Sequence, residues 1–180
     1  MKFSEQRVIG FTIVELLIVI VVIGILASIT IVAFNGVQER AHASKIDSDL
    51  KSLKSAILSA RISSDTTLWA LTGGRSGGDG LITADTCNWE PDGTDFSELP
   101  ASSQCWTKYN DTLEAISAAS GANVRGLKDP YGRPYFIYEN EGRAANPCQK
   151  DELSAFSRPH VMWGAMWAHT ITVPNSLSGC

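Results

Sequence analysis

Hydrophobic residues are concentrated near the start of this chain. Nineteen of the 24 residues from Phe11 to Phe34 are apolar, and the run from Leu16 to Phe34 holds no charged side chain. At about 1.5 Å per residue, a helix over that run is roughly 28 Å long, close to the thickness of the hydrocarbon core of a bilayer. The pattern therefore predicts a membrane-spanning helix.

A secretory signal peptide is the alternative explanation of this run. The apolar part of a signal peptide spans only about 7–15 residues and is followed by small residues at the cleavage site. Here the run is longer, and the small pair Ala27-Ser28 lies inside it. The ten residues before it are polar and net positive, with Lys2 and Arg7 against Glu5. Because positive flanks stay in the cytoplasm, we expect the C-terminal part to lie outside the cytoplasmic membrane.

The apolar pattern changes after Gly36. Four apolar residues then recur at spacings of 4, 3 and 4 with charged residues between them, as in an amphipathic helix: Ile46, Leu50, Leu53 and Ile57. If this helix continues the first one, a single helix runs from Phe11 to about Ile62. Its apolar stripe is then expected to pack on a sheet.

The rest of the chain predicts a small mixed head. The sequence Asp111-Thr112-Leu113-Glu114 has the form of a capping box and predicts the start of a short helix that Gly121 ends. Runs rich in aromatic and β-branched residues predict strands at Tyr135–Tyr138, Val161–Trp163 and His169–Val173. One helix followed by few strands favours an α+β head with a small antiparallel sheet.

The composition and charge of the chain give no sign that it binds an anionic partner. The 180 residues include 15 Lys+Arg and 19 Asp+Glu, for a formal net charge of −4 and a pI near 5.3. The basic residues are scattered, so no clear nucleic-acid partner is indicated. The three histidines form no HExxH pair and no nucleophile motif occurs, so we expect no enzyme.

One charged residue interrupts the apolar segment. Glu15 lies four residues after Phe11, and no Lys or Arg occurs between Phe11 and Phe34 to compensate it. A carboxylate in lipid is costly without a partner. A cut between Gly10 and Phe11 would create an α-amine one helical turn from Glu15, which could neutralise the carboxylate of its own chain or of a neighbour.

The sequence Gly10-Phe11-Thr12-Ile13-Val14-Glu15, followed by an apolar run, closely resembles the N-terminal signature of type IV prepilins and the related pseudopilins. The resemblance implies that a prepilin peptidase/N-methyltransferase removes residues 1–10 and methylates Phe11. It also implies assembly into a helical homo-oligomeric filament on an inner-membrane platform, with Glu15 as the charge partner in docking. The chain then divides into a leader (1–10), a transmembrane and filament-core helix (11–34) and an extracytoplasmic pilin-like head (35–180) that includes the amphipathic helix 37–62.

All four cysteines lie in the predicted head: Cys87, Cys105, Cys148 and Cys180. They form no CxxC pair, and an even number in an oxidising compartment favours two disulfides. Three connectivities are possible. We favour Cys87 with Cys105 and Cys148 with Cys180, because each closes a modest loop; four free buried thiols are the alternative.

Acidic residues gather between positions 79 and 98, with no basic residue among them. Oxygen ligands from one loop can hold calcium, and the pseudopilins that the chain resembles are known for such a loop. Asp92 and Asp95 are the candidate ligands, but no EF-hand spacing is present, and a solvated acidic loop is the favoured interpretation. We expect no other cofactor.

These features predict a structural subunit of a type IV pilus-like filament, held in the cytoplasmic membrane before assembly and in a cell-surface pilus afterwards. A major pseudopilin of a type II secretion system is the first alternative, because the sequence Asp129-Pro130-Tyr131-Gly132 resembles a turn found before the sheet in such proteins. The disulfide-bearing head favours the pilus. A single-pass membrane-anchored binding domain is the second alternative.

Overall fold

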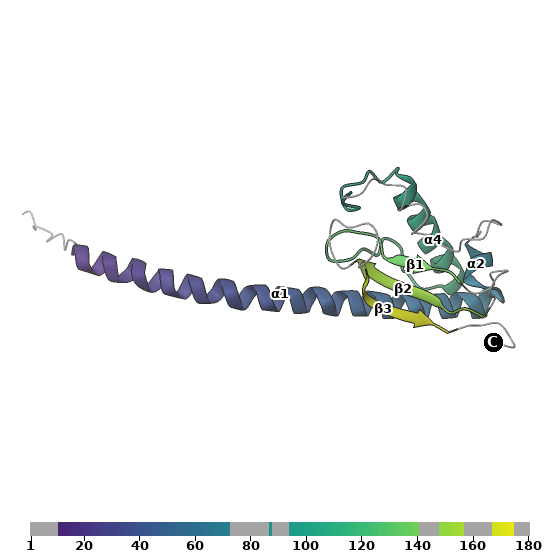
Figure 1. Ribbon diagram of the computed structural model, residues 1–180, viewed down its shortest axis with the longest axis horizontal. Coiled ribbons are helices and arrows are strands. Elements are labelled where there is room, and N and C mark those ends of the chain that lie inside the picture. The colour runs from purple at the N-terminus through teal and green to yellow at the C-terminus, as the bar shows by residue number, and fades with distance from the viewer. Residues whose placement is uncertain (1–10, 73–86, 88–93, 141–147, 157–166, 175–180) are drawn as a thin grey trace, which may run out of the picture. The chain divides into compact units, whose positions relative to one another are not determined.

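The computed structural model of the chain describes residues 11–72, 87, 94–140, 148–156 and 167–174 (Figure 1). Contacts within the chain divide it into two units, Met1–Ala41 and His42–Cys180. Along the sequence the elements are α1 (Ile13–Ser64), α2 (Leu68–Leu71), α4 (Gln104–Ser120), β1 (Phe136–Tyr138), β2 (Asp151–Phe156) and β3 (Trp167–Val173).

Helix α1 is continuous over 52 residues, which confirms the predicted long N-terminal helix. In the second unit its apolar stripe is buried: Ile46 is 5% exposed, and Leu50, Leu53 and Ile57 are fully buried. The stripe belongs to one core with residues of α4 and of all three strands, including Tyr109, Leu113, Ile116, Ile137, Leu153 and Val173. The apolar residues of the amphipathic pattern therefore form the face of α1 that packs against the rest of the head.

The three strands form one antiparallel sheet in the order β1-β2-β3. Phe136 pairs with Ser154, and Leu153 pairs with Ile171. The register shifts between Ser154 and Ala155, where the pairing of β2 with β3 is irregular. A long N-terminal helix packed on a small antiparallel sheet confirms the predicted α+β, pilin-like fold.

The central strand β2 is absent from the sequence predictions. Its residues include Asp151, Glu152 and Ser154, which have low β propensity. Strand β2 pairs on both sides and buries five of its six residues. Its pairing and burial therefore stabilise the strand more than its own β propensity does. The predicted strand Val161–Trp163 lies outside the described residues, and β3 contains the predicted strand His169–Val173.

The prediction that a helix starts at Asp111 is wrong. Helix α4 begins at Gln104, and Ser103 is its N-cap, whose side chain accepts a hydrogen bond from the Trp106 amide. Asp111 lies inside the helix on an exposed face. The predicted end is confirmed, because Gly121 caps the helix in the left-handed conformation with φ 73°.

A buried ion pair closes the turn that precedes β1. The Asp129 Oδ1 atom accepts hydrogen bonds from the amides of Tyr131 (2.9 Å) and Arg133 (2.8 Å), and Arg133 Nε donates to Asp129 Oδ2 (2.7 Å). The Arg133 guanidinium also donates to the carbonyl oxygen of Phe156 at 3.0 Å. Gly132 supplies the φ of +82° at the centre of the turn. These bonds fix the start of β1 to the end of β2.

Candidate assembly site

Thr12 and Glu15 form a reciprocal capping box at the N-terminal end of α1. The Thr12 amide and hydroxyl donate to Glu15 Oε2 at 2.8 and 2.7 Å, and the Glu15 amide is 3.2 Å from Thr12 Oγ1. In this arrangement each side chain satisfies a backbone donor of the first turn that has no partner within the helix. The carboxylate that interrupts the apolar segment is thus held by its own chain.

Sequence reasoning identified Glu15 but missed Thr12. The signal was present, because a Thr or Ser followed three residues later by Glu is the sequence form of a capping box. Phe11, the predicted new N-terminal residue, is 83% exposed. Gly10 lies outside the described residues, so cleavage after Gly10 stays a prediction.

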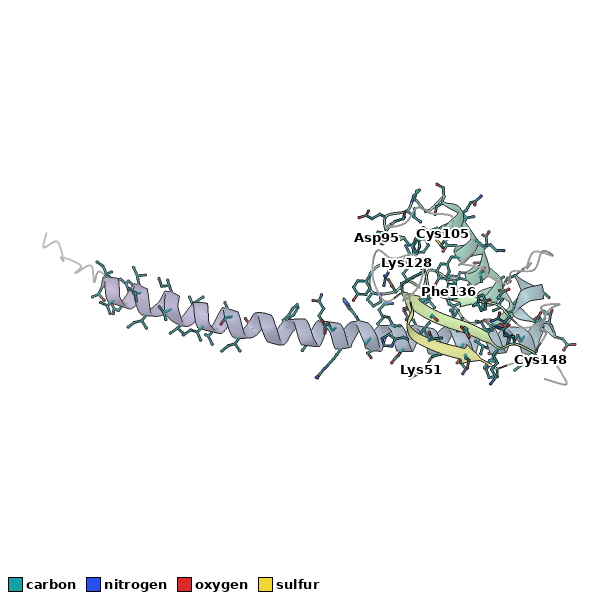
Figure 2. All side chains as sticks on the ribbon, in the orientation of Figure 1. Lys51, Asp95, Cys105, Lys128, Phe136 and Cys148 are labelled. Atoms are coloured by element: carbon teal, nitrogen blue, oxygen red, sulfur yellow. A yellow bond between two sulfur atoms is a disulfide. The ribbon has the colours of Figure 1, made fainter. Side chains whose placement is uncertain are left out.

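The first half of α1 has the length and composition of a membrane span. The segment Ile13–Thr30 has a mean hydropathy of 2.9 and none of it is buried. Figure 2 draws its side chains along this part of the helix. The Ser28 and Thr30 hydroxyls donate to carbonyl oxygens of the same helix, at 2.7 and 2.9 Å. Glu15 is the only charged residue of the segment, so its apolar surface needs lipid or other helices around it.

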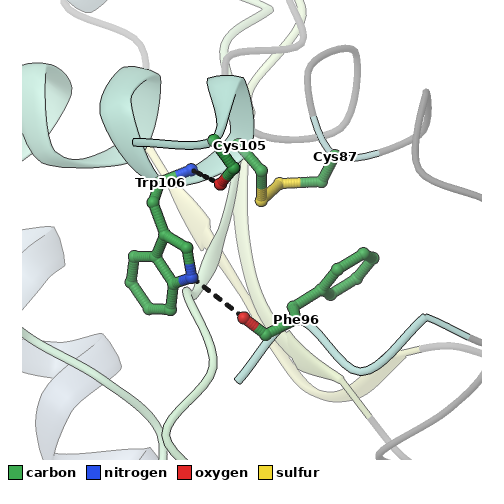
Figure 3. Close-up of a disulfide and its surroundings, with 5 residues drawn as sticks. Cys87, Phe96, Cys105 and Trp106 are labelled. Atoms are coloured by element: carbon green, nitrogen blue, oxygen red, sulfur yellow. Dashed lines mark hydrogen bonds between the residues drawn. A yellow bond between two sulfur atoms is a disulfide. The ribbon is translucent and has the colours of Figure 1, made fainter. Parts of the chain in front are cut away.

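Cys87 and Cys105 form a disulfide, with their Cα atoms 4.6 Å apart and a separation of 18 positions in sequence (Figure 3). This is the pairing that loop length favoured. The two cysteines are buried with Phe96 and Phe156 in a small second core. Beside them, Trp106 Nε1 donates to the carbonyl oxygen of Phe96 at 2.9 Å. The bridge therefore ties the start of α4 to a compact apolar cluster.

The second predicted disulfide is described only at one of its ends. Cys148 is disulfide-bonded, and Cys180 lies outside the described residues. The head therefore holds a disulfide at Cys148 in addition to the Cys87–Cys105 bridge.

The candidate calcium ligands are only partly described. Asp92 lies outside the described residues. Asp95 Oδ1 accepts hydrogen bonds from the Ser97 amide (2.9 Å) and hydroxyl (2.7 Å), which closes a local turn. Among the residues that the structure describes, no three His, Cys, Asp or Glu side chains are grouped to hold a metal. Calcium binding at these two aspartates stays a prediction.

A buried ion pair joins the end of α1 to the sheet. The Arg61 guanidinium contacts the Asp151 carboxylate, with both side chains almost fully buried, and also donates to the carbonyl oxygen of Pro174 at 2.6 Å. The Asn140 amide donates to Asp151 Oδ1 at 2.6 Å. The sequence contains no pattern that pairs residues 90 positions apart, so this contact was not predicted.

Comparison with known proteins finds relatives that share one name, type II secretion system core protein G. That of Aeromonas hydrophila is 33% identical over 133 residues, which cover 73% of this chain and 73% of the relative. Those of Klebsiella pneumoniae and Pectobacterium carotovorum subsp. carotovorum are 42% and 43% identical over 52 and 54 residues, or 29% and 30% of this chain. The chain spans only 37% and 35% of the length of these two relatives. No protein-family model and no solved structure matches the chain.

The Aeromonas relative extends the similarity well beyond the N-terminal helix and into the head. The fold agrees with it, because a long helix with an apolar, unburied first half is followed by a small antiparallel sheet. The chain belongs to the family of type II secretion system core protein G, a family of pseudopilins.

Proposed function

We propose that the protein is a structural subunit of a type II secretion pseudopilus, a filament built from copies of this chain. The observation that carries the proposal is the match to the Aeromonas core protein G over 73% of both chains. The unburied apolar segment Ile13–Thr30 supports it physically, since packing this surface between copies removes it from water. The role is structural, and the chain's residues are acted on rather than acting on a substrate.

The proposal includes a processing step and two successive locations. Prepilin peptidase cuts after Gly10 at the cytoplasmic face and methylates the new terminus at Phe11. The chain is stored in the cytoplasmic membrane with its head outside and then moves into the filament through an inner-membrane platform. The net positive first ten residues and the single span in α1 support this orientation.

A surface pilus is the second candidate function. The observation that favours it is the disulfide-bearing head, in which Cys87–Cys105 and a bridge at Cys148 suit exposure outside the cell. The shared name of the relatives favours the pseudopilus over the pilus, and this reverses the preference drawn from the sequence.

Deletion of the gene, with complementation by the wild-type chain, separates the two functions. We expect the deletion strain to lose secretion of exported proteins while its surface filaments remain. Loss of surface filaments with normal secretion would overturn the pseudopilus and support the pilus. If both are unchanged, neither filament function is supported, and the membrane-anchored binding domain is the remaining candidate.

Intact-mass spectrometry tests the processing step independently. The expected mature chain starts at Phe11 and carries one added methyl group. A membrane-extracted chain that retains residues 1–10 would overturn both filament functions, because assembly depends on the amine created by the cut.

A further inference from the structure

Glu139 is an acidic residue placed in the interior of the head. It directly follows β1 and its exposed fraction is 0%. Among the described residues, the groups that face it are Arg61 of α1, Thr72 at the end of α2, Lys108 of α4 and Asp151 of β2. A carboxylate without close compensation is costly in such a place, so the partners of Glu139 decide its charge.

The two nearby cations make their described contacts elsewhere. The Arg61 guanidinium contacts Asp151 and the Pro174 carbonyl oxygen. Lys108 Nζ donates to the carbonyl oxygen of Thr72 at 3.3 Å. Neither contact involves Glu139, whose Oε2 atom has no hydrogen-bond partner among the described residues. Among the described residues, the ionised form of Glu139 therefore has no direct ion-pair partner, and Lys108 and Arg61 compensate its charge only from a distance.

The hydroxyl group of Thr72 indicates where a proton lies. Thr72 Oγ1 is 2.6 Å from Glu139 Oε1 and 2.9 Å from the carbonyl oxygen of Leu68. Both neighbours are acceptors if Glu139 is ionised, but a hydroxyl carries only one hydrogen. Both short contacts become hydrogen bonds only when Glu139 itself carries a proton and donates it to Thr72 Oγ1, which then donates to Leu68.

We propose that Glu139 is protonated in the folded head and acts as a pH-sensitive lock on the end of α2. In the locked state the proton of Glu139 lies on Oε1 and points to Thr72, and the Thr72 proton points to the last turn of α2. Loss of the Glu139 proton leaves two acceptors for one hydrogen and places a charge without a direct ion-pair partner in the core. The contact between α2 and the residue after β1 is then lost.

The electrostatics of the site agree with this arrangement. Burial raises the pKa of Glu139 to about 8, and the nearby Asp151 charge also raises it. A hydrogen bond donated by Thr72 to the ionised carboxylate, and the charges of Lys108 and Arg61, lower the pKa by less than burial raises it. The pKa in the folded head is thus above its value in the unfolded chain. For an acid shifted in this direction, the stabilisation is fully present below the unfolded pKa and is lost as the pH rises through about 8.

The test compares three full-length proteins in detergent micelles: wild type, Glu139→Gln and Glu152→Gln. The side-chain amide that Glu139→Gln introduces can donate to Thr72 as the protonated acid does, but it does not ionise. Glu152 lies exposed on β2 and is the matched control. We expect the folding equilibrium constant of wild type to fall, relative to that of Glu139→Gln, by on the order of a thousandfold between pH 5 and pH 9.

The measurements are chemical unfolding at each pH and hydrogen exchange of the peptide that contains α2, corrected for the intrinsic exchange rate. Wild type and Glu152→Gln should lose protection of α2 above about pH 8, and Glu139→Gln should keep it. An equal pH dependence of wild type and Glu139→Gln would overturn the lock.

A second measurement does not depend on unfolding. The carboxyl carbons of 13C-glutamate-labelled wild type are titrated by NMR. One glutamate should titrate near pH 8, several units above the exposed ones, and its signal should be missing in Glu139→Gln if that variant folds. If every glutamate titrates below pH 6, the proposal is wrong.

Discussion

At the scale of single residues, Glu15 combines two properties that the structure allows to be separated. Its carboxylate accepts the hydrogen bonds that cap α1 through Thr12, and it carries the only charge of the Ile13–Thr30 segment. A glutamine at this position also completes a capping box, because its side-chain oxygen accepts the same bonds, but it has no charge. Glu15→Gln, which keeps the capping oxygen, and Glu15→Ala, which removes it, therefore separate capping from charge.

We expect Glu15→Gln and Glu15→Ala to insert into the membrane like wild type and to assemble poorly, because both lack the charge that we propose to pair with the amine created by cleavage after Gly10. Membrane fractionation measures insertion, and cross-linking between copies of the chain together with secretion of exported proteins measures assembly. Thr12→Ser, which keeps the capping hydroxyl, is the control and should assemble normally. Normal assembly by Glu15→Gln, with a defect in Glu15→Ala alone, would show that capping rather than charge is required.

The sequence predicts a residue well only where a local pattern carries the signal. Gly10, Phe11 and Glu15 stand in one short motif, and their family resemblance follows from it. Thr72 and Glu139 are 67 residues apart, and nothing in either segment indicates that they meet. Their contact depends on how α2 and β1 pack, which is a tertiary property.

At the scale of elements, the second half of α1 is stabilised by its buried stripe more than by helix propensity. Leu53 is fully buried in the main core, whereas Lys51 on the same helix is exposed. Truncating a buried leucine loses its transfer free energy and leaves a cavity. Leu53→Ala and Lys51→Ala are therefore a matched pair of substitutions, one in the core and one on the surface of the same helix.

We expect Leu53→Ala to lower the free energy of unfolding of the head by about 2–5 kcal/mol, and Lys51→Ala to change it by less than about 0.5 kcal/mol. Denaturant unfolding followed by tryptophan fluorescence measures both. Similar small effects of the two substitutions would contradict the placement of the stripe in the core.

The sequence pattern predicts some of these elements and misses others. The 4-3-4 spacing predicts the buried face of α1, because amphipathic periodicity and packing agree there. The start of α4 was misplaced because Asp111-Thr112-Leu113-Glu114 fits a capping box inside a helix as well as at its start. Strand β2 was missed because pairing on both sides outweighs its weak β propensity.

At the scale of the whole molecule, covalent bonds support a head with a modest core. The Cys87–Cys105 bridge joins the second core cluster to the start of α4. A disulfide that closes a loop of this size stabilises the fold by about 3 kcal/mol if it acts by restricting the unfolded chain. The bridge therefore accounts for a sizeable part of the stability of a small domain.

The double variant Cys87→Ser/Cys105→Ser should unfold at a lower temperature than wild type, corresponding to a loss of about 2–4 kcal/mol. Thermal unfolding without reductant measures the difference. With reductant present, wild type should lose at least this much stability. An unchanged midpoint in the double variant would mean that the bridge is dispensable for the folded head.

The turn before β1 has a consequence for the order in which the head folds. The Asp129 amide donates to the Arg133 carbonyl oxygen, and the Gly132 amide donates to that of Asp129, so these bonds close within five residues. Short loops lose little entropy on closure, and such contacts form rapidly. The pairing of β1 with β2 and the bond from Arg133 to Phe156 close a longer loop of chain. The turn can thus form first and hold β1 in place until β2 arrives.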